Sequence, residues 1–255
     1  MKFIHITDTH LLKYGELLHG LDTQKRFELC VRSIRESHSD AHCIVVTGDL
    51  ADRGEQEAYR FFKEQIASTG LPVYSILGNH DERDIYRVQF PNELLNSDGF
   101  VQGAIETPVG VFLLLDTKLD GSDAGTFCER RQQWLQDQLN KFSSVPVYLF
   151  MHHPPFDLNL PCIDKIGLDS KESFAAVVNT HTDVRHIFFG HAHRPLCGNW
   201  RGISFSSMRG TNHQVKLNFK DNEIHAISED PEYAIVFIDD DQLVVHTHSY
   251  LSDYN

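Results

Sequence analysis

Short apolar runs alternate with segments of helical periodicity along the first third of the chain. The runs Phe3–Ile6, Cys43–Val46 and Val73–Leu77 are apolar and β-favouring, which predicts buried strands. Arg26–Arg35 and Glu55–Ala67, which lie between them, carry apolar residues at helical spacing. This β-α-β-α-β order predicts a parallel sheet with right-handed crossover connections.

The pattern changes beyond the third strand. Two apolar runs, Val101–Glu106 and Val109–Leu115, flank Thr107–Pro108 and predict an antiparallel hairpin. The remaining predicted elements are helices at Glu129–Leu139 and Ser173–Val178 and strands at Val145–Met151, Val184–Phe189, Ile203–Ser206, Ala234–Ile238 and Leu243–His248. Because no linker, repeat or low-complexity stretch interrupts the chain, we expect one domain over residues 1–255, with two mixed sheets packed together and helices outside.

Polar residues that can bind metal ions follow the predicted strands. A set of seven is spread over the motifs D-T-H, G-D, G-N-H-D, M-H-H and G-H-A-H: Asp8, His10, Asp49, Asn79, His152, His191 and His193. A parallel-type sheet would bring these motifs to one edge. In an extended segment Asp8 and His10 would point to the same side, and the last two histidines would repeat that geometry.

The seven side chains offer carboxylate, imidazole and amide-oxygen ligands. This mixed set suits Mn²⁺, Fe, Co²⁺ or Zn²⁺ and disfavours a structural zinc site with thiolate ligands. Because seven ligands are too many for one ion, we expect two ions per chain, bridged by Asp49. One ion would be completed by Asp8, His10 and His193, and the other by Asn79, His152 and His191.

A pair of ions indicates a reaction class. Ions roughly 3.5–4 Å apart can share a water molecule, lower its pKa and hold the oxygens of an in-line displacement. Two divalent cations outweigh two aspartates, so the site would be positive inside an acidic protein and would attract an anionic phosphate ester. We therefore expect hydrolysis by attack of a metal-bound hydroxide on phosphorus.

Two residues that follow Asn79 are candidates for roles other than metal binding. His80 cannot easily face the same ion as its neighbour, and it is placed to bond a phosphoryl oxygen or to protonate the leaving alkoxide. Asp81 would hold the His80 ring in the required tautomer.

Charge and composition limit the partners and the compartment. The formal net charge of −13 argues against a nucleic acid polymer as partner, and no basic tract is present. Five cysteines without a C-x-x-C motif indicate free thiols in a reducing compartment. The apolar runs are too short to span a bilayer, and the N-terminus lacks the features of a signal peptide. We therefore expect a cytoplasmic protein without a membrane partner.

The ordered motifs carry a family resemblance. D-T-H, G-D-L-A-D-R-G, G-N-H-D, H-H-P and G-H-A-H resemble the calcineurin-like binuclear metallophosphoesterases. From Phe3 to about Val215 the chain most resembles class III cyclic-nucleotide phosphodiesterases and bacterial glycerophosphodiesterases. The resemblance implies a four-layer α/β/β/α sandwich and the ligand set above, and it suggests a homodimer or higher homo-oligomer. It also places G-T-N-H-Q-V near the active site, so His213 is either a substrate contact or a surface histidine.

The leading function is hydrolysis of small phosphodiesters, such as 3′,5′-cyclic nucleotides (cAMP among them) or glycerophosphodiesters. The loops Leu11–Asp22, Pro154–Asp169 and Arg209–Ser228 lack periodicity, so we expect them to rim the site and to set the substrate.

Two alternatives remain. A phosphomonoesterase of the same superfamily would open with G-D-x-H-G, whereas this chain has T-D-T-H. Monoester dianions also favour additional arginines, and those plausible here are Arg53, Arg83, Arg194 and Arg209. Arg53 either contacts phosphate, as the related motif does in protein phosphatases, or caps the helix region Glu55–Ala67. The other alternative is a non-catalytic metal-binding scaffold.

Overall fold

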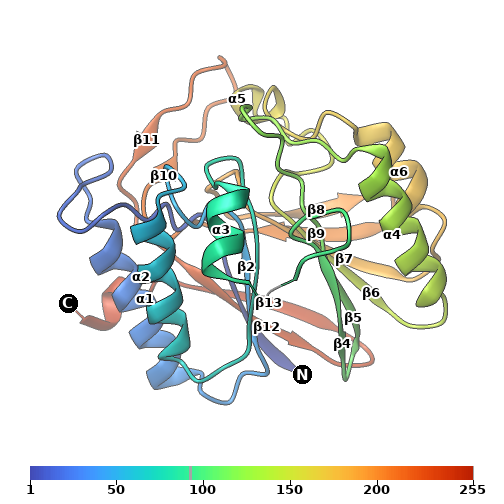
Figure 1. Cartoon of the computed structure of the whole chain (residues 1–255), viewed down its shortest axis with the longest axis horizontal. Helices are drawn as coiled ribbons and strands as arrows, with labels where there is room; N and C mark the ends of the chain where they lie inside the picture. Colours follow the sequence, from blue (N-terminus) through green and yellow to red (C-terminus); the bar gives the residue numbers. More distant parts are fainter. Residues whose placement is uncertain (92–93, 255) are drawn as a thin grey trace.

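Two β-sheets pack face to face, and helices cover the outer face of each (Figure 1). The computed structural model describes residues 1–91 and 94–254. Within these residues the first sheet has the order β13-β12-β1-β2-β3, and the second has the order β4-β5-β6-β7-β9-β8. A small antiparallel hairpin, β10-β11, stands apart from both. The predicted α/β/β/α arrangement is therefore confirmed.

The strand bounds follow the predicted apolar runs closely. The first sheet consists of β1 (Lys2–Ile6), β2 (Ile44–Thr47), β3 (Val73–Ile76), β12 (Tyr233–Ile238) and β13 (Leu243–His248). The second consists of β4 (Gly103–Thr107), β5 (Gly110–Leu114), β6 (Val147–Met151), β7 (Val184–Phe189), β8 (Leu196–Trp200) and β9 (Ile203–Ser207). The separate hairpin joins β10 (Gln214–Val215) to β11 (Ala226–Ile227). The predicted antiparallel pair is β4 and β5.

The helices divide between the two outer faces. On the first sheet lie α1 (Thr23–Ser37), α2 (Gln56–Ala67) and α3 (Arg83–Gln89), and beyond β13 comes the 3-10 helix η1 (Tyr250–Tyr254). The second sheet carries α4 (Glu129–Lys141) and α6 (Lys171–Val178), and α5 (Pro161–Asp164) is a single turn in a loop. Sequence periodicity did not predict α3, α5, η1, β8, β10 or β11.

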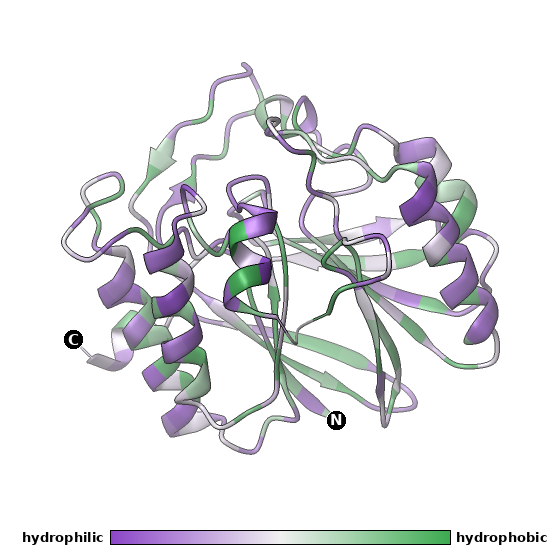
Figure 2. Ribbon diagram, in the orientation of Figure 1, coloured by the Kyte–Doolittle hydropathy of each residue, from purple (hydrophilic) through white to green (hydrophobic). Residues whose placement is uncertain are grey.

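Three apolar layers hold the sandwich together, and Figure 2 shows the hydrophobic strands between more hydrophilic helix surfaces. Between the sheets, the Phe3 ring packs against those of Phe112 and Phe188, with centroids 5.1 and 5.5 Å away. The next residue, Ile4, faces the other way and joins the layer under α1 and α2. This alternation is expected for a strand covered on both faces.

The topology delivers the carboxyl ends of several strands to one region. β1, β2 and β3 run parallel in the first sheet, as do β5, β6, β7 and β9 in the second. Contacts between the loops that follow these strands cross from one sheet to the other, as the site geometry below shows. The five cysteines are free thiols, as predicted. Among the described residues, no helix combines the length and apolar character needed to cross a membrane.

Candidate metal centre

The predicted ligands lie in the turns that follow five strands of the two sheets. Asp8 and His10 follow β1, Asp49 follows β2, and Asn79 follows β3. His152 directly follows β6, and the G-H-A-H motif follows β7. The parallel strands therefore place residues that are distant in the sequence around one point.

Asp49 lies between the two groups of side chains. One oxygen of its carboxylate, Oδ2, is 3.4 Å from Nε2 of His10 and 3.3 Å from Nε2 of His152. On one side, Nε2 of His193 is 3.1 Å from Nε2 of His10 and 3.4 Å from Oδ1 of Asp8. The cluster of Asp8, His10, Asp49 and His193 is fully buried.

A second group lies on the other side of Asp49. The side-chain oxygen of Asn79 is 3.1 Å from Nε2 of His152 and 3.0 Å from Nδ1 of His191. The structure thus brings all seven predicted ligands together, in two groups of three that flank Asp49. The assignment of these two groups to two ions stays a prediction.

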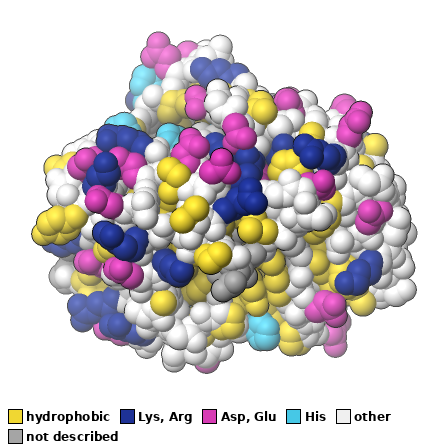
Figure 3. All heavy atoms as spheres, in the orientation of Figure 1, with side chains coloured by type: hydrophobic (Ala, Val, Ile, Leu, Met, Phe, Trp, Pro, Cys, Tyr) yellow, Lys and Arg dark blue, Asp and Glu magenta, His cyan; other side chains and the backbone are white. Residues whose placement is uncertain are grey.

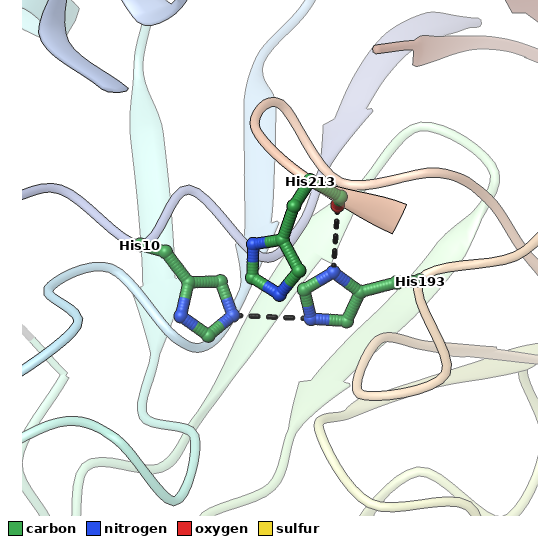
Figure 4. Close-up of side chains that lie close together, drawn as sticks. All are labelled: His10, His193 and His213. Carbon is green, nitrogen blue, oxygen red and sulfur yellow. Dashed lines mark hydrogen bonds between the residues drawn. The ribbon is translucent and has the colours of Figure 1, made fainter. Parts of the chain in front are cut away.

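Three of the histidine rings are held by hydrogen bonds on the side away from the cluster. Nδ1 of His10 donates to the Asp52 carboxylate at 3.0 Å, and Nδ1 of His152 donates to the Thr47 carbonyl at 2.8 Å. Nδ1 of His193 donates to the His213 carbonyl at 3.0 Å, as Figure 4 shows. These bonds leave Nε2 of each ring directed at the cluster, which is how metal-binding histidines are usually oriented.

The donor set fits a pair of cations. When both Nδ1 atoms donate, neutral rings of His10 and His193 present lone pairs to each other at Nε2, an arrangement that requires positive charge nearby. Two buried atoms, Oδ2 of Asp8 and Nε2 of His191, have no hydrogen-bond partner. Buried acceptors without partners are costly, and bound metal cations would provide partners for these two atoms.

The pKa shifts in the cluster also indicate that it favours positive charge. Burial opposes the charge on Asp49, but His152, His80 and His10 together outweigh burial and hold the pKa of that carboxyl well below its ordinary range. Burial lowers the pKa of His152, whereas Asp49, Asp8 and the Thr47 carbonyl together raise it more, to about 9. For His10, burial is likewise outweighed by the Asp52 hydrogen bond and nearby aspartates, so its pKa is raised. The carboxylates thus draw positive charge into the cluster.

The backbone of the ligand turns corrects one expectation. We expected extended segments at D-T-H and G-H-A-H, but each ligand there has a left-handed backbone: φ is 53° at Asp8, 44° at His10, 66° at His191 and 47° at His193. Asp49 also has a left-handed backbone, with φ of 51°. The strands end before the motifs, and the chain turns to aim these side chains inward. The φ values are sterically disfavoured for residues other than glycine.

His80 lies at the cluster without joining the buried group. Its backbone N–H donates to Oδ1 of Asp49 at 2.9 Å, and its ring Nδ1 donates to the Asp52 carbonyl at 2.8 Å. The side chain is 39% exposed, and its ring centroid lies 4.6 Å from that of His10. Because a carbonyl can only accept, Nε2 of His80 is the ring nitrogen available to a ligand.

The predicted role of Asp81 is wrong. Its buried carboxylate does not touch the His80 ring but accepts hydrogen bonds from the backbone N–H groups of Gly78, Leu50 and Ala51 and from the Tyr59 hydroxyl. Asp81 therefore ties the turn after β3 to the turn after β2. Asp52, and not Asp81, lies next to the His80 ring.

The two remaining predicted residues have different surroundings. The ring of His213 lies 4.6 Å from that of His193 and 5.0 Å from that of His10, centroid to centroid, and Figure 4 shows the three rings gathered together. Burial first, and then the neighbouring histidines, lower the pKa of His213. Arg53 does not line the cavity: its exposed guanidinium pairs with Glu16 at 3.0 Å, and its Nε lies 3.8 Å from the Asp52 carboxylate.

A cavity of about 340 Å³ opens over the cluster. Its polar lining includes six histidines, Asn79 and three aspartates: His10, His19, His80, His191, His193, His213, Asn79, Asp49, Asp52 and Asp123. Its apolar lining is Leu18, Ile163, Ile166, Val215 and Ile224. These residues confirm that the three loops predicted to rim the site do so.

Sequence reasoning missed two residues that support the cluster. Asp52 holds His10 and approaches His80, and its place three residues after Asp49 in the G-D-L-A-D-R-G motif was the available signal. Lys118 is buried, and its ammonium donates to the backbone carbonyl of Asn79 at 3.2 Å. No sequence pattern marks Lys118, because the contact joins loops from different sheets.

Comparisons with known proteins agree with this geometry. A family model described as calcineurin-like phosphoesterase matches residues 1–195. The chain is 35% identical over 257 residues to a probable cyclic nucleotide phosphodiesterase of Rhodopseudomonas palustris, covering 99% of this chain and 94% of that protein. It is 29% identical over 260 residues to a probable glycerophosphodiester phosphodiesterase of Arcobacter nitrofigilis, covering 100% and 94%. A dimetal phosphatase from Danio rerio shares the fold, with a TM-score of 0.73, 17% identity and coverage of 98% and 96%.

Proposed function

The chain belongs to the calcineurin-like phosphoesterases, a family of binuclear metal enzymes, and from this premise we propose that it hydrolyses small phosphodiesters. The observation that carries the proposal is the pair of ligand groups flanking Asp49 beneath an open cavity. The proposed substrates are 3′,5′-cyclic nucleotides and glycerophosphodiesters, in keeping with the names of the two relatives, a probable cyclic nucleotide phosphodiesterase and a probable glycerophosphodiester phosphodiesterase.

The charge of the cavity favours a diester over a monoester. None of the described residues that line it is Lys or Arg, and Asp52 and Asp123 add negative charge. The four arginines considered from the sequence are not part of this lining, and they bind Glu16 and Asp52 (Arg53), Asp116 and Asp120 (Arg83), the Val215 carbonyl (Arg194), and Glu229 and Glu232 (Arg209). A monoester dianion would need more positive charge than a diester monoanion.

We assign the two metal positions to the two flanking groups. Asp8, His10 and His193 would hold one ion, and Asn79, His152 and His191 the other, with Asp49 shared. When bound, such ions supply Lewis acidity and an activated water for displacement at phosphorus. Asp52, Thr47 and the His213 carbonyl keep three imidazoles in the tautomer that this requires.

His80 is the proposed proton donor or phosphoryl-oxygen contact. Its Nδ1 is occupied by the Asp52 carbonyl, so Nε2 serves the substrate. With Nδ1 protonated, a neutral ring would offer Nε2 only as an acceptor, and donation to a phosphoryl oxygen or to a leaving alkoxide requires the doubly protonated ring. His213 is the second proposed substrate contact, because it lines the cavity beside His10.

Parallel assays test the proposal. Protein stripped with chelator and reloaded with Mn²⁺, Fe²⁺, Co²⁺ or Zn²⁺ is assayed with bis(p-nitrophenyl) phosphate and p-nitrophenyl phosphate. We expect a higher kcat/KM for the diester with at least one metal, and activity in a panel of cyclic nucleotides and glycerophosphodiesters. The stripped protein is the control. A clear preference for the monoester would refute the diesterase proposal.

A further inference from the structure

The lining of the cavity includes five aliphatic side chains besides its polar residues, and we call these five the apolar wall. Leu18 comes from the loop after β1, Ile163 and Ile166 come from the loop containing α5, and Val215 and Ile224 come from the β10–β11 hairpin. Figure 1 shows this hairpin and α5 at the same edge of the molecule, beyond the ends of the strands. Three separate loops therefore contribute aliphatic side chains to the lining of the site.

The wall begins next to the predicted metal ligands. Ile163 and Val215 are only 1% and 4% exposed, and they belong to a hydrophobic cluster that includes Ala192. Ala192 lies between His191 and His193 in the sequence and is itself buried. The apolar wall thus packs against the turn that carries two predicted ligands. The fold therefore fixes the distance between the wall and the predicted metal site.

The outer part of the wall leaves apolar surface uncovered. Ile224 is 49% exposed, and Ile166 is partly exposed, although both line the cavity. The ammonium of Lys165 donates to the Asn222 carbonyl at 2.6 Å and ties the α5 loop to the β10–β11 hairpin. A ligand seated there would remove aliphatic surface from water.

We propose that this wall is a subsite for an apolar or aromatic organic group of the substrate, in preference to a polyol such as glycerol. The inference rests on the proposed phosphodiesterase function. Aliphatic side chains gain from burial against an aryl or alkyl group, but they offer no partners for hydroxyl groups that lose their water. Among the described lining residues that have no role assigned above, His19 and Asp123 are the polar ones, and they are too few to satisfy a polyol across the whole wall.

The test compares two diesters in a double variant. Ile166→Ser with Ile224→Ser removes the outer wall without touching the packed core, and Val88→Ser on α3 is the control, because Val88 is 72% exposed and lies outside the cavity. Turnover is measured with bis(p-nitrophenyl) phosphate and with glycerophosphoglycerol. Binding of diphenyl phosphate and of glycerophosphoglycerol to the metal-loaded protein is measured by calorimetry.

Each substrate is compared between wild type and variant, so its intrinsic reactivity cancels. For the aryl diester we expect kcat/KM to fall about tenfold, mainly through KM, because the lost contacts act in binding. The affinity for diphenyl phosphate should fall in parallel, and both values for glycerophosphoglycerol should stay nearly unchanged.

The outcomes separate the subsite from the reaction. An equal loss for both diesters, or no loss for the aryl compounds, would overturn the subsite. Selective loss of diphenyl phosphate affinity in a protein that turns over neither diester would support the subsite and overturn the proposed function alone.

Discussion

At the residue scale, the side chains and backbone carbonyls that support the cluster orient its predicted ligands. Asp52 and Thr47 hold the rings of His10 and His152 from behind, and Asp81 joins the backbones of two ligand turns. Such supporting bonds fix the tautomer and orientation of a ligand before any ion arrives. Substitutions at the site therefore have distinct expected effects, according to which atom they remove.

Asp49→Asn removes charge from the point shared by both groups. Its carboxylate lies within 3.4 Å of histidine nitrogens on either side, so both metal positions should weaken, by at least about 100-fold in affinity. Titration calorimetry and metal analysis measure the effect. Asp84→Asn, at a 96% exposed carboxylate, is the control. Loss of one ion with retention of the other would show that Asp49 is not shared.

His80→Ala should separate catalysis from metal binding. The ring is partly exposed and only its backbone N–H bonds Asp49, so we expect two ions to remain while kcat falls roughly 10²–10⁴-fold, the range for loss of a general acid or base. Metal analysis and steady-state kinetics provide both readings. His42→Ala, at an exposed histidine outside the cavity, is the control. Parallel loss of metal would identify His80 as a ligand.

At the scale of elements, the turns after the strands pack so closely that glycine is required between them. A Cβ on Gly78 would overlap the carboxylate of Asp49, and one on Gly190 would overlap the Thr7 hydroxyl. The turn after β3 is thus pressed against the turn after β2, and the turn after β7 against the turn after β1. This close approach gives the two sheets a common site.

Gly78→Ala should therefore damage metal binding through sterics alone. The backbone of Gly78 does not need a left-handed conformation, so alanine is tolerated there except for its contact with Asp49. We expect a loss of about 1–3 kcal/mol in stability together with weaker metal binding, measured by thermal unfolding and calorimetry. Gly167→Ala is the matched control, because its Cβ would meet atoms no closer than 3.6 Å. Equal effects in both variants would contradict the prediction.

The elements also show where sequence reasoning stops. Apolar runs and helical spacing located the central strands and main helices, and residue order placed the ligand motifs at their ends. The edge strand β8 was missed because its Cys197, Gly198 and Asn199 are exposed and carry no alternation. The left-handed turns and the role of Asp81 were missed because contacts between loops impose them, and local propensity does not reveal such contacts.

At the scale of the whole molecule, charges of both signs are spread over one face of the surface, and some histidines are buried. Figure 3 shows Lys and Arg interspersed with Asp and Glu over one face, so the net charge of −13 does not form a single-sign field there. Among the buried histidines that are not predicted ligands, His186, near Phe188, bonds Ser206 at 2.8 Å, and His5 bonds Thr47 at 2.8 Å.

These two histidines predict acid sensitivity of the fold. Burial lowers the pKa of His5 to about 3 and that of His186 to about 4, from an ordinary value of 6.5. Between about pH 6.5 and 4 the unfolded chain binds these protons and the folded chain does not, so stability falls as pH falls, by up to about 1.4 kcal/mol per pH unit for each residue. Urea unfolding at constant metal load, from pH 7 to 4.5, measures the slope.

A variant isolates the contribution of one residue. His186→Gln keeps a side chain able to bond Ser206 but does not titrate, so its stability should depend less steeply on pH than that of the wild type. An identical slope would mean that His186 does not contribute. The predicted ligand histidines are present in both proteins, so their titration cancels.

The left-handed residues at the site link the stability of the protein to its activity. Five of the seven predicted ligands hold φ values between 44° and 66°, each at a cost on the order of 1 kcal/mol that glycine would not incur. Selection for thermal stability alone would therefore replace these residues early, and each replacement would remove a ligand. A screen for stabilised variants should therefore also measure activity. A homologue with glycine at these positions would be expected to be more stable and to have lost the metal ligands.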